Sequence, residues 1–316
     1  MKPLYAFWAG FLLVNILACT ASDRVQFVEA ENQIDVLVDG KPLTSYRWGG
    51  SLTKPVLYPL FTPAGIKVTR GFPFEKVEGE TIDHPHQTGL FFTYDQVNGN
   101  GFWNNTIFPP RIVHTAIQEM YGGKEGVLST ESLWIDKKET PLLQEKRRMV
   151  FIPDDSEVAI DFSIRLIALV DSVVFEDTKE GMFAVRVAHW LREEDQTGQY
   201  LSSNGDIGEK AVWGKRAEWV RLAGQKEGQK VGMVIMHHPS SVNFPTFWHA
   251  RAYGLFSANP LGQYVFESAR GVPNAKPFRL TLKKGESALF RFRVILYDGV
   301  RSAEEISARY KLFAQN

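Results

Sequence analysis

The stretch EVAIDFSIRLIALV, residues 157–170, alternates apolar and polar side chains along most of its length. Successive side chains of a β-strand point to opposite faces of a sheet, so this pattern predicts a strand with one buried face. Its length is typical of the extended, curved strands of a large β-sandwich.

The same period-two pattern recurs on both sides of this stretch. Examples are VQFVEA (25–30), TGLFFTY (88–94), VGMVIMHH (231–238) and ESALFRFRVILYDG (286–299), and turn residues bound the runs. Irregular strand lengths and the absence of a fixed repeat disfavour a barrel or a propeller. We therefore expect an all-β protein, with a single large, many-stranded β-sandwich domain over residues 19–316.

Only the C-terminal segment has a helical pattern. Ser302 is followed three residues later by Glu305, as in a capping box, and Ile306, Tyr310 and Phe313 recur at helical spacing. The sequence thus predicts one C-terminal α-helix.

The N-terminus has the pattern of a cleaved leader. Lys2 precedes an apolar run over residues 4–18 that is too short for a comfortable membrane span. Ile16-Leu17-Ala18-Cys19 resembles a bacterial lipobox, and Cys19 is the only cysteine of the chain; a buried structural cysteine is the alternative. We predict a lipoprotein signal peptide over residues 1–18, a lipid anchor at Cys19, no disulfides, and a location in the periplasm or at the cell surface.

Charge and aromatic content narrow the function. Lysine plus arginine equals aspartate plus glutamate at 36 each, so no net field attracts nucleic acid or an acidic membrane surface. Aromatic residues make up 13% and include eight tryptophans, which suit either a broad β core or stacking platforms for sugar rings. The sequence has no glycine-rich phosphate loop, nucleophile elbow or paired-cysteine metal site.

DHPHQTG, residues 83–89, places two of the seven histidines around one proline. On an extended backbone His84 and His86 face the same side, where they could bind a metal or transfer protons with Asp83 as the orienting carboxylate. Pro85 restricts the backbone between the histidines, and Gly89 lets the chain enter the next strand. The alternative is a turn whose histidines cap the neighbouring backbone.

Four further clusters combine polar and aromatic residues. DQVNGNGFWNN (95–105) and AVWGKRAEWV (211–220) carry amides, tryptophans and cations that suit sugars, although amides are also ordinary turn residues. FEDTKEGMFAVRVAHW (175–190) and HHPSSVNFPTFWHARAYG (237–254) add acids, arginines and histidines. The candidate substrate-binding residues are Asn98, Trp103, Arg186, Trp213, Lys215, Arg216, His238, Trp248 and Arg251, and the candidate catalytic residues are Asp83, His84, His86, Glu180 and His249.

DHPHQTGLFF, KEGMFAVRVA, WGKRAEWV and HHPSSVNFPTFWHARAYG, in this order, resemble motifs of the PmoA-like family of bacterial secreted proteins over about residues 65–295. The resemblance implies a large β-sandwich in bacteria that degrade polysaccharides, near sugar oxidoreductase genes. The family is named after a methane mono-oxygenase subunit, but no segment past residue 18 could span a bilayer, so methane oxidation is excluded. The family usually has His-Arg where this chain has Gln87-Thr88, which removes two side chains from the implied site.

The leading hypothesis is an extracytoplasmic enzyme, of hydrolase or lyase type, that acts on a glycoside or an oxidised (keto) sugar. His84, His86 and His249 would transfer protons, with Asp83 or Glu180 as a carboxylate partner. In the same hypothesis, Arg216 and Arg251 hold a carboxylate or keto oxygen, and Trp103, Trp213 and Trp248 stack on sugar rings.

Two alternatives stay open. A non-catalytic carbohydrate-binding surface lipoprotein needs the tryptophans and amides but no proton chemistry. A zinc site formed by His84, His86 and His249, with Asp83 as a further candidate ligand, would have the open position that catalysis requires. In each case we expect residues 83–89 to line a pocket and to meet residues 248–251 across the sandwich.

Overall fold

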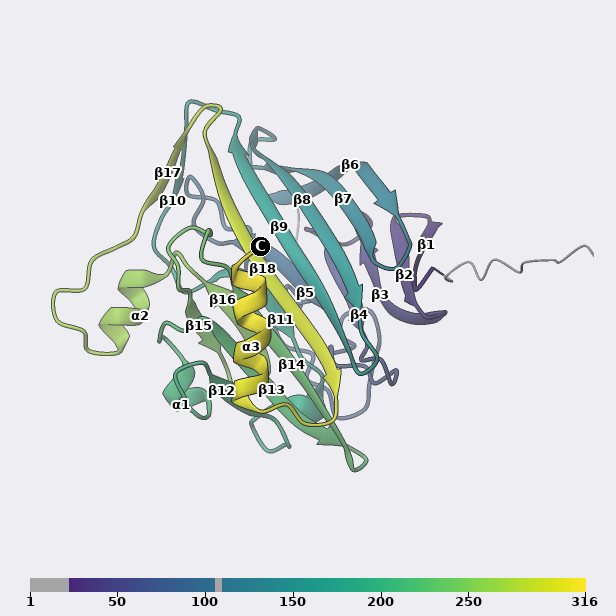
Figure 1. Ribbon diagram of the computed structural model, residues 1–316. Coiled ribbons are helices and arrows are strands. Elements are labelled where there is room, and N and C mark those ends of the chain that lie inside the picture. The colour runs from purple at the N-terminus through teal and green to yellow at the C-terminus, as the bar shows by residue number, and fades with distance from the viewer. Residues whose placement is uncertain (1–22, 106–109) are drawn as a thin grey trace, which may run out of the picture.

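The computed structural model describes residues 23–105 and 110–316. In these residues two eight-stranded sheets pack face to face as a sandwich, and one long helix lies at the C-terminus (Figure 1). The predicted fold class is confirmed. The predicted leader and Cys19 lie outside the described residues. Within the described ranges, no helix is long and apolar enough to cross a membrane.

Neighbouring strands run antiparallel in both large sheets. The first sheet has the order β1 (Val25–Ala30), β2 (Gln33–Val38), β3 (Lys41–Arg47), β4 (Val56–Leu60), β5 (Leu90–Tyr94), β11 (Gly181–Arg186), β16 (Leu255–Asn259) and β15 (Phe247–Ala250). The second has the order β12 (Gln199–Ser202), β13 (Trp219–Lys226), β14 (Gln229–His237), β18 (Ser287–Asp298), β9 (Glu157–Ala168), β8 (Pro141–Pro153), β7 (Gly126–Ile135) and β6 (Arg111–Tyr121). A separate pair joins β10 (Ser172–Phe175) to β17 (Leu280–Lys283).

The alternating stretch at residues 157–170 forms β9, between β8 and β18 in the second sheet. Phe162 of β9 lies opposite Met149 of β8 and Phe292 of β18, and all three side chains are buried between the two sheets. Strands with one buried face are therefore paired so that their apolar sides build a common core.

The C-terminal helix α3 (Ala303–Ala314) covers the outer face of the second sheet, across β18, β14 and β13 (Figure 1). Ser302 and Glu305 form the predicted capping box: the Glu305 amide donates to Ser302 Oγ at 3.2 Å, and the Ser302 amide donates to Glu305 Oε2 at 2.7 Å. Two short helices, α1 (Glu209–Val212) and α2 (Gln263–Ala269), were not predicted, because so few residues cannot display a helical period.

The outer face of the first sheet is also covered. Val56, Phe91 and Ala184 are successive partners across β4, β5 and β11, and they form an apolar cluster with the buried Trp103. The segment between β4 and β5, residues 61–89, contributes Phe74 to this cluster. Because this segment lies on apolar side chains of the sheet, it has a fixed surface on which to build a site.

Gly89 marks the point where this segment re-enters the sheet. Its φ of 56° lies in the left-handed region, and a Cβ there would overlap the Leu57 carbonyl oxygen and meet Tyr58 Cβ at 3.0 Å. The role expected of Gly89 is therefore confirmed, since a side chain would separate β4 from β5.

Replacing Ser302 by alanine removes the oxygen that caps α3 and should lower the free energy of unfolding by about 1 kcal/mol. Urea unfolding at neutral pH measures the loss. Ser307→Ala, in the middle of the same helix, is the matched control and should leave stability unchanged or slightly raised. Equal effects of the two substitutions would show that the cap does not stabilise the helix.

Candidate functional site

Two buried arginines hold the loop that contains DHPHQTG. Arg70 is 2% exposed and Arg186, at the end of β11, is 1% exposed. Arg70 donates to the carbonyl oxygens of Thr81, Asp83, His84 and Gln87, at 2.8 to 3.3 Å. A single guanidinium thus satisfies four backbone acceptors and fixes the path of residues 81–87.

Asp83 is the carboxylate shared by the two arginines. Its Oδ1 accepts from Arg70 Nη1 at 2.9 Å and from Arg186 Nη2 at 3.0 Å, while Arg186 Nη1 donates to Gln87 Oε1 at 2.6 Å. Burial raises the pKa of Asp83, but the hydrogen bond from Thr81 and the charge of Arg186 outweigh burial and hold this pKa well below its ordinary value. Asp83 is therefore ionised throughout the physiological range.

Two contacts orient the imidazole ring of His84, one with Asp83 and one with Tyr253. Its Nδ1 lies 2.5 Å from Asp83 Oδ2, and its ring stacks on Tyr253 with centroids 5.4 Å apart and planes 7° from parallel. Its φ of 45° is unusual for a residue with a side chain, and the Arg70 bond to its carbonyl oxygen holds it there. The ring stays 42% exposed, so His84 forms a rim that solvent and ligands can reach.

His86 lines a pocket of about 190 Å³ on the outer face of the first sheet. Polar side chains from three segments surround this pocket, with Leu52, Val56 and two prolines as apolar neighbours. The polar residues are Ser51, Thr53, Lys54, His86, Thr88 and Asn105.

Lys54 is the unusual member of this pocket. It is 3% exposed, and its Nζ donates to the Trp103 carbonyl at 3.4 Å and to Asn105 Oδ1 at 3.3 Å, above the ring of Phe91. No carboxylate of the described residues forms an ion pair with it. Burial lowers the pKa of Lys54 from 10.5 to about 7, although the charge of Asp95 opposes the shift. A neutral amine is therefore abundant near neutral pH.

His86 is the second perturbed group in the pocket. Burial, and then the positive charge of Lys54, lower the pKa of His86 to about 3, so the imidazole is neutral at physiological pH. Its Nε2 is buried and has no hydrogen-bond partner among the described protein atoms. A buried polar atom without a partner is uncommon in folded proteins and is often found at functional sites. Lys54 and His86 together thus form a pair of proton-transfer groups, one neutral and one that titrates near neutral pH.

His249 does not join this pocket. Val56, Phe91, Ala184, Ser257 and His249 form one row across β4, β5, β11, β16 and β15, so four strand spacings separate His249 from Val56, or about 19 Å at about 4.8 Å each. His249 is buried, and its Nδ1 lies 3.0 Å from the Lys179 carbonyl oxygen. The predicted catalytic grouping of His249 with His84 and His86 is wrong, because His249 lies four strand spacings from the pocket that His86 lines.

A metal site is likewise not formed. Within residues 23–105 and 110–316, no three histidine, cysteine or acidic side chains are placed to hold a metal ion. The proposed zinc ligands His84, His86 and His249, with or without Asp83, are therefore not assembled.

Two of the three tryptophans expected to stack on sugars belong to the core. Trp103 and Trp248 are both 0% exposed, and Trp248 Nε1 donates to the Ala217 carbonyl at 3.1 Å. Trp213 is half-buried, against the rings of His249 and Phe266. The prediction that Trp103 and Trp248 are stacking platforms is wrong, since neighbouring side chains cover their faces.

Several other predicted residues stabilise loops instead of the pocket. Arg216 donates to the carbonyl oxygens of Asn243 and Pro245 and to Gln263 Oε1. Asn98 pairs with the backbone of β10. Lys215 pairs with Asp206 at 2.5 Å, and Glu180 pairs with Lys179 at 3.1 Å. His238 lies under α3, where its ring packs against Phe313.

Arg251 and its neighbours do meet the DHPHQTG loop, but on one face of the first sheet and not across the sandwich. Arg251 pairs with Glu209 at 2.8 Å, and its guanidinium lies 5.6 Å from the centroid of the Tyr253 ring on which His84 stacks. Arg186 lies 4.6 Å from the same centroid. The expected proximity is therefore mediated by Tyr253, which sequence reasoning did not single out.

Lys54, Arg70 and Asn105 were also missed. Tyr253 and Asn105 lie inside motifs that had been noted for other residues, so closer attention to those motifs could have found them. Lys54 and Arg70 stand in SLTKPV and KVTRG, where nothing local distinguishes a buried cation from an exposed one.

One family model matches this chain: DUF6807, described as a family of unknown function, over residues 33–311. The chain belongs to this family. The resemblance to the PmoA-like family is corrected by this match, because the matching model is that of DUF6807. No curated protein matches the chain.

The solved structures that resemble this DUF6807 member are distant from it. A GH36 α-galactosidase from Geobacillus stearothermophilus is 11% identical with a TM-score of 0.45, over 86% of this chain and 40% of that one. A galactose mutarotase related enzyme from Lactobacillus acidophilus is 10% identical with a TM-score of 0.33, over 87% and 97%. A putative aldose 1-epimerase from Escherichia coli K12 is 10% identical with a TM-score of 0.29, over 88% and 99%. The chain thus spans well under half of the galactosidase, and these likenesses are too distant to indicate its activity.

Replacing Asp83 by asparagine leaves Arg70 and Arg186 without their shared charge and should lower stability by about 2–3 kcal/mol. Trypsin should also cut faster after the exposed Lys76, because the loop loses its anchor. Asp195→Asn, in an exposed turn, is the matched control. Unchanged stability and proteolysis in Asp83→Asn would contradict an anchoring role.

Lys54→Met should stabilise the protein most below pH 7. The folded-state pKa of about 7 lies below the unfolded value of 10.5, so the unfolded chain binds more protons between these pH values and wild-type stability rises with pH across that window. The advantage of Lys54→Met should therefore shrink by about 2 kcal/mol or more from pH 6 to pH 10. Urea unfolding at both pH values measures it, with the exposed Lys226→Met as control; a pH-independent difference would show that burial does not perturb Lys54.

Proposed function

We propose that this DUF6807 member is a carbohydrate-active enzyme that transfers a proton at the carbon next to a sugar carbonyl. One observation carries the proposal: Lys54 and His86 line the same small pocket, and burial leaves His86 neutral and gives Lys54 a large neutral fraction near neutral pH. A base works best when its pKa lies near the operating pH, and about 7 meets this condition.

Each group has a distinct role in the proposed step. The amine of Lys54 takes the proton from the carbon. The electron pair of that C–H bond forms a C=C bond, and the π electrons of the carbonyl move onto its oxygen to give an enediolate. His86, a neutral imidazole, donates a hydrogen bond to this oxygen and stabilises the developing charge. Return of the proton to the opposite face of the same carbon completes an epimerisation. Transfer of the hydroxyl proton between the two enediolate oxygens, followed by return of the proton to the neighbouring carbon, completes an isomerisation, and neither reaction needs a co-reactant.

Fixed positions support this chemistry. Asn105 and the Trp103 carbonyl hold the Lys54 amine, and the anchored loop holds His86. Side chains that are already in place need no reorganisation when the transition state forms.

The local charge also favours an enediolate. Arg70 and Arg186 lie behind the loop, and both contribute to the lowered pKa of His86. Among the residues that the structure describes, Asp83 is the single carboxylate that forms ion pairs with these arginines. The excess of positive charge stabilises an anion in the pocket more than the neutral substrate.

The lining suits a sugar of one ring or an acyclic sugar. Thr53, Thr88 and Asn105 can bind hydroxyl groups, while Leu52 and Val56 face the carbon skeleton. A volume of about 190 Å³ leaves no room for a longer glycan. The non-catalytic alternative is less well supported, because Trp103 and Trp248 offer no exposed ring for stacking.

The proposed reaction exchanges a carbon-bound hydrogen with solvent, which gives a direct assay. Aldoses, ketoses, keto-glycosides and uronic acids are incubated with the protein in D2O, and loss of proton NMR signals next to the carbonyl is followed. Lys54→Met should slow exchange by about 10²-fold or more, and His86→Leu should slow it by about 10²-fold. The rate should rise with pH through about 7, as Lys54 loses its proton.

Lys226→Met, on the second sheet and outside the pocket, is the control and should exchange at the wild-type rate. Exchange that survives in Lys54→Met, or that no sugar in the panel shows with wild-type protein, would sink the proposal.

We also infer from the sequence that the chain is cleaved before Cys19 and lipidated there, which places it in the periplasm or at the cell surface. Labelling of expressing cells with a palmitate analogue should mark the wild-type protein and not Cys19→Ser. Equal labelling of both proteins would contradict a lipid anchor at this residue.

A further inference from the structure

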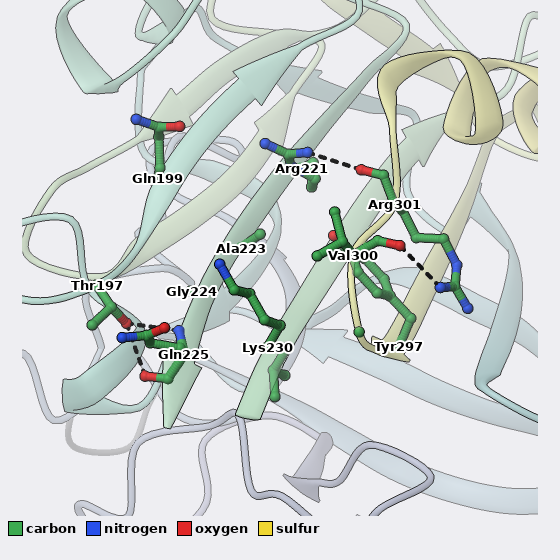
Figure 2. Close-up of a pocket in the computed structure, with 12 residues that line it drawn as sticks. Thr197, Gln199, Arg221, Ala223, Gly224, Gln225, Lys230, Tyr297, Val300 and Arg301 are labelled. Carbon is green, nitrogen blue, oxygen red and sulfur yellow. Dashed lines mark hydrogen bonds between the residues drawn. The ribbon is translucent and has the colours of Figure 1, made fainter. Parts of the chain in front are cut away.

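A second concave site lies on the outer face of the second sheet, on the side of the sandwich opposite to Lys54 and His86. It is a groove of about 380 Å³ along β12, β13 and β14, and the loop that follows β18 closes one side (Figure 2). It is about twice the volume of the Lys54 pocket, and its chemistry is different.

The groove exists because α3 covers only part of this sheet. The helix packs on Trp219, Met236 and Ile295, whereas Ala223 and Gly224, further along β13, carry almost no side chain. Tyr297 lies flat over Gly232, where a Cβ would overlap its ring. Small residues on the floor and a flat ring beside them leave the space open.

The lining carries three cations, Arg221, Lys230 and Arg301, and no carboxylate. Arg301 is held outside the groove: its Nε lies 3.3 Å from Glu157 Oε2, a carboxylate that also pairs with Arg309 at 2.6 Å, and its Nη2 donates to Ser156 Oγ at 2.6 Å. The two cations of the lining that are left to bind a ligand are therefore Arg221 and Lys230.

Arg221 and Lys230 form no ion pair with any carboxylate of the described residues. One bond fixes Arg221, from Nη1 to the Arg301 carbonyl oxygen at 3.0 Å, and its buried Nε has no partner. Figure 2 shows the Lys230 amine directed into the groove, with the amides of Gln199 and Gln225 at its edge. A positioned guanidinium beside a free ammonium matches an oxyanion, and side-chain amides match hydroxyl groups.

We propose that this groove binds an anionic sugar, through its carboxylate or phosphate at Arg221 and Lys230 and its hydroxyls at Gln199 and Gln225. The site is separate from the Lys54 pocket and does not depend on the function proposed for it. It gives the protein a second, non-catalytic contact with acidic carbohydrate.

Calorimetric titration of the wild-type protein with glucuronate, glucose 6-phosphate and glucose tests the proposal. At least one of the two anions should bind about tenfold more tightly than glucose, and added salt should weaken that binding. Lys230→Gln should weaken it about fivefold or more, whereas Lys226→Gln, an exposed lysine at the end of β13, should not.

Arg221→Gln should reduce binding further, and the exposed Lys230 provides the decisive variant if loss of the Arg221 bond destabilises the chain. Binding of glucuronate alone identifies a carboxylate site, and binding of glucose 6-phosphate alone identifies a phosphate site. Equal affinity for glucose, no binding of either anion, or wild-type affinity in Lys230→Gln overturns the proposal. Lys54→Met should bind as wild type does, which separates this result from any failure of the proposed catalysis.

Discussion

Two buried guanidinium groups determine where the candidate site lies. Arg70 and Arg186 are removed from water beneath one loop, and burial of a charge is costly unless it is paired and hydrogen-bonded. Asp83 supplies the opposite charge, and four backbone carbonyls supply acceptors for Arg70. These hydrogen bonds and ion pairs form when residues 81–87 follow this path, so the pairing of the two guanidinium groups holds the loop in place.

The anchored loop affects the proposed chemistry because it helps to bury Lys54 and His86. The anchored loop places His86 against Lys54, and the loop and the cluster around Trp103 exclude water from the lysine. Exclusion of water lowers the pKa of both groups, because each loses solvation of its charged form. Fold stability and proposed reactivity are therefore coupled: a charged Lys54 destabilises the folded state, and the same penalty yields a neutral amine.

The sequence predicted the features that depend on local pattern. The alternation at residues 157–170 identified β9, the Ser302–Glu305 spacing identified the cap of α3, and Gly89 was expected to be a steric requirement. Each of these three features depends on residues that are close together in the sequence.

The site depended on long-range burial, which local pattern does not encode. Lys54 has an ordinary sequence context, yet the 103–105 segment and the loop at 85–88 bury it. His249 does share a sheet face with the pocket, as its strand position allowed, but four strand spacings separate it from Val56 in the pocket. The number of tryptophans could not show whether a given tryptophan belongs to the core or stacks on a sugar. The same ring suits both roles, and its role depends on whether neighbouring side chains cover its faces.

The proposed chemistry requires that about half of the Lys54 amines are neutral near pH 7, and NMR titration of this side chain measures that fraction. The 13Cε resonance, assigned by its absence in Lys54→Met, is followed from pH 5 to pH 11 in the folded protein, where these two limits bracket the perturbed and ordinary values at about 7 and 10.5. The account predicts a midpoint near 7. A midpoint near 10.5, as for a solvated lysine, would contradict it.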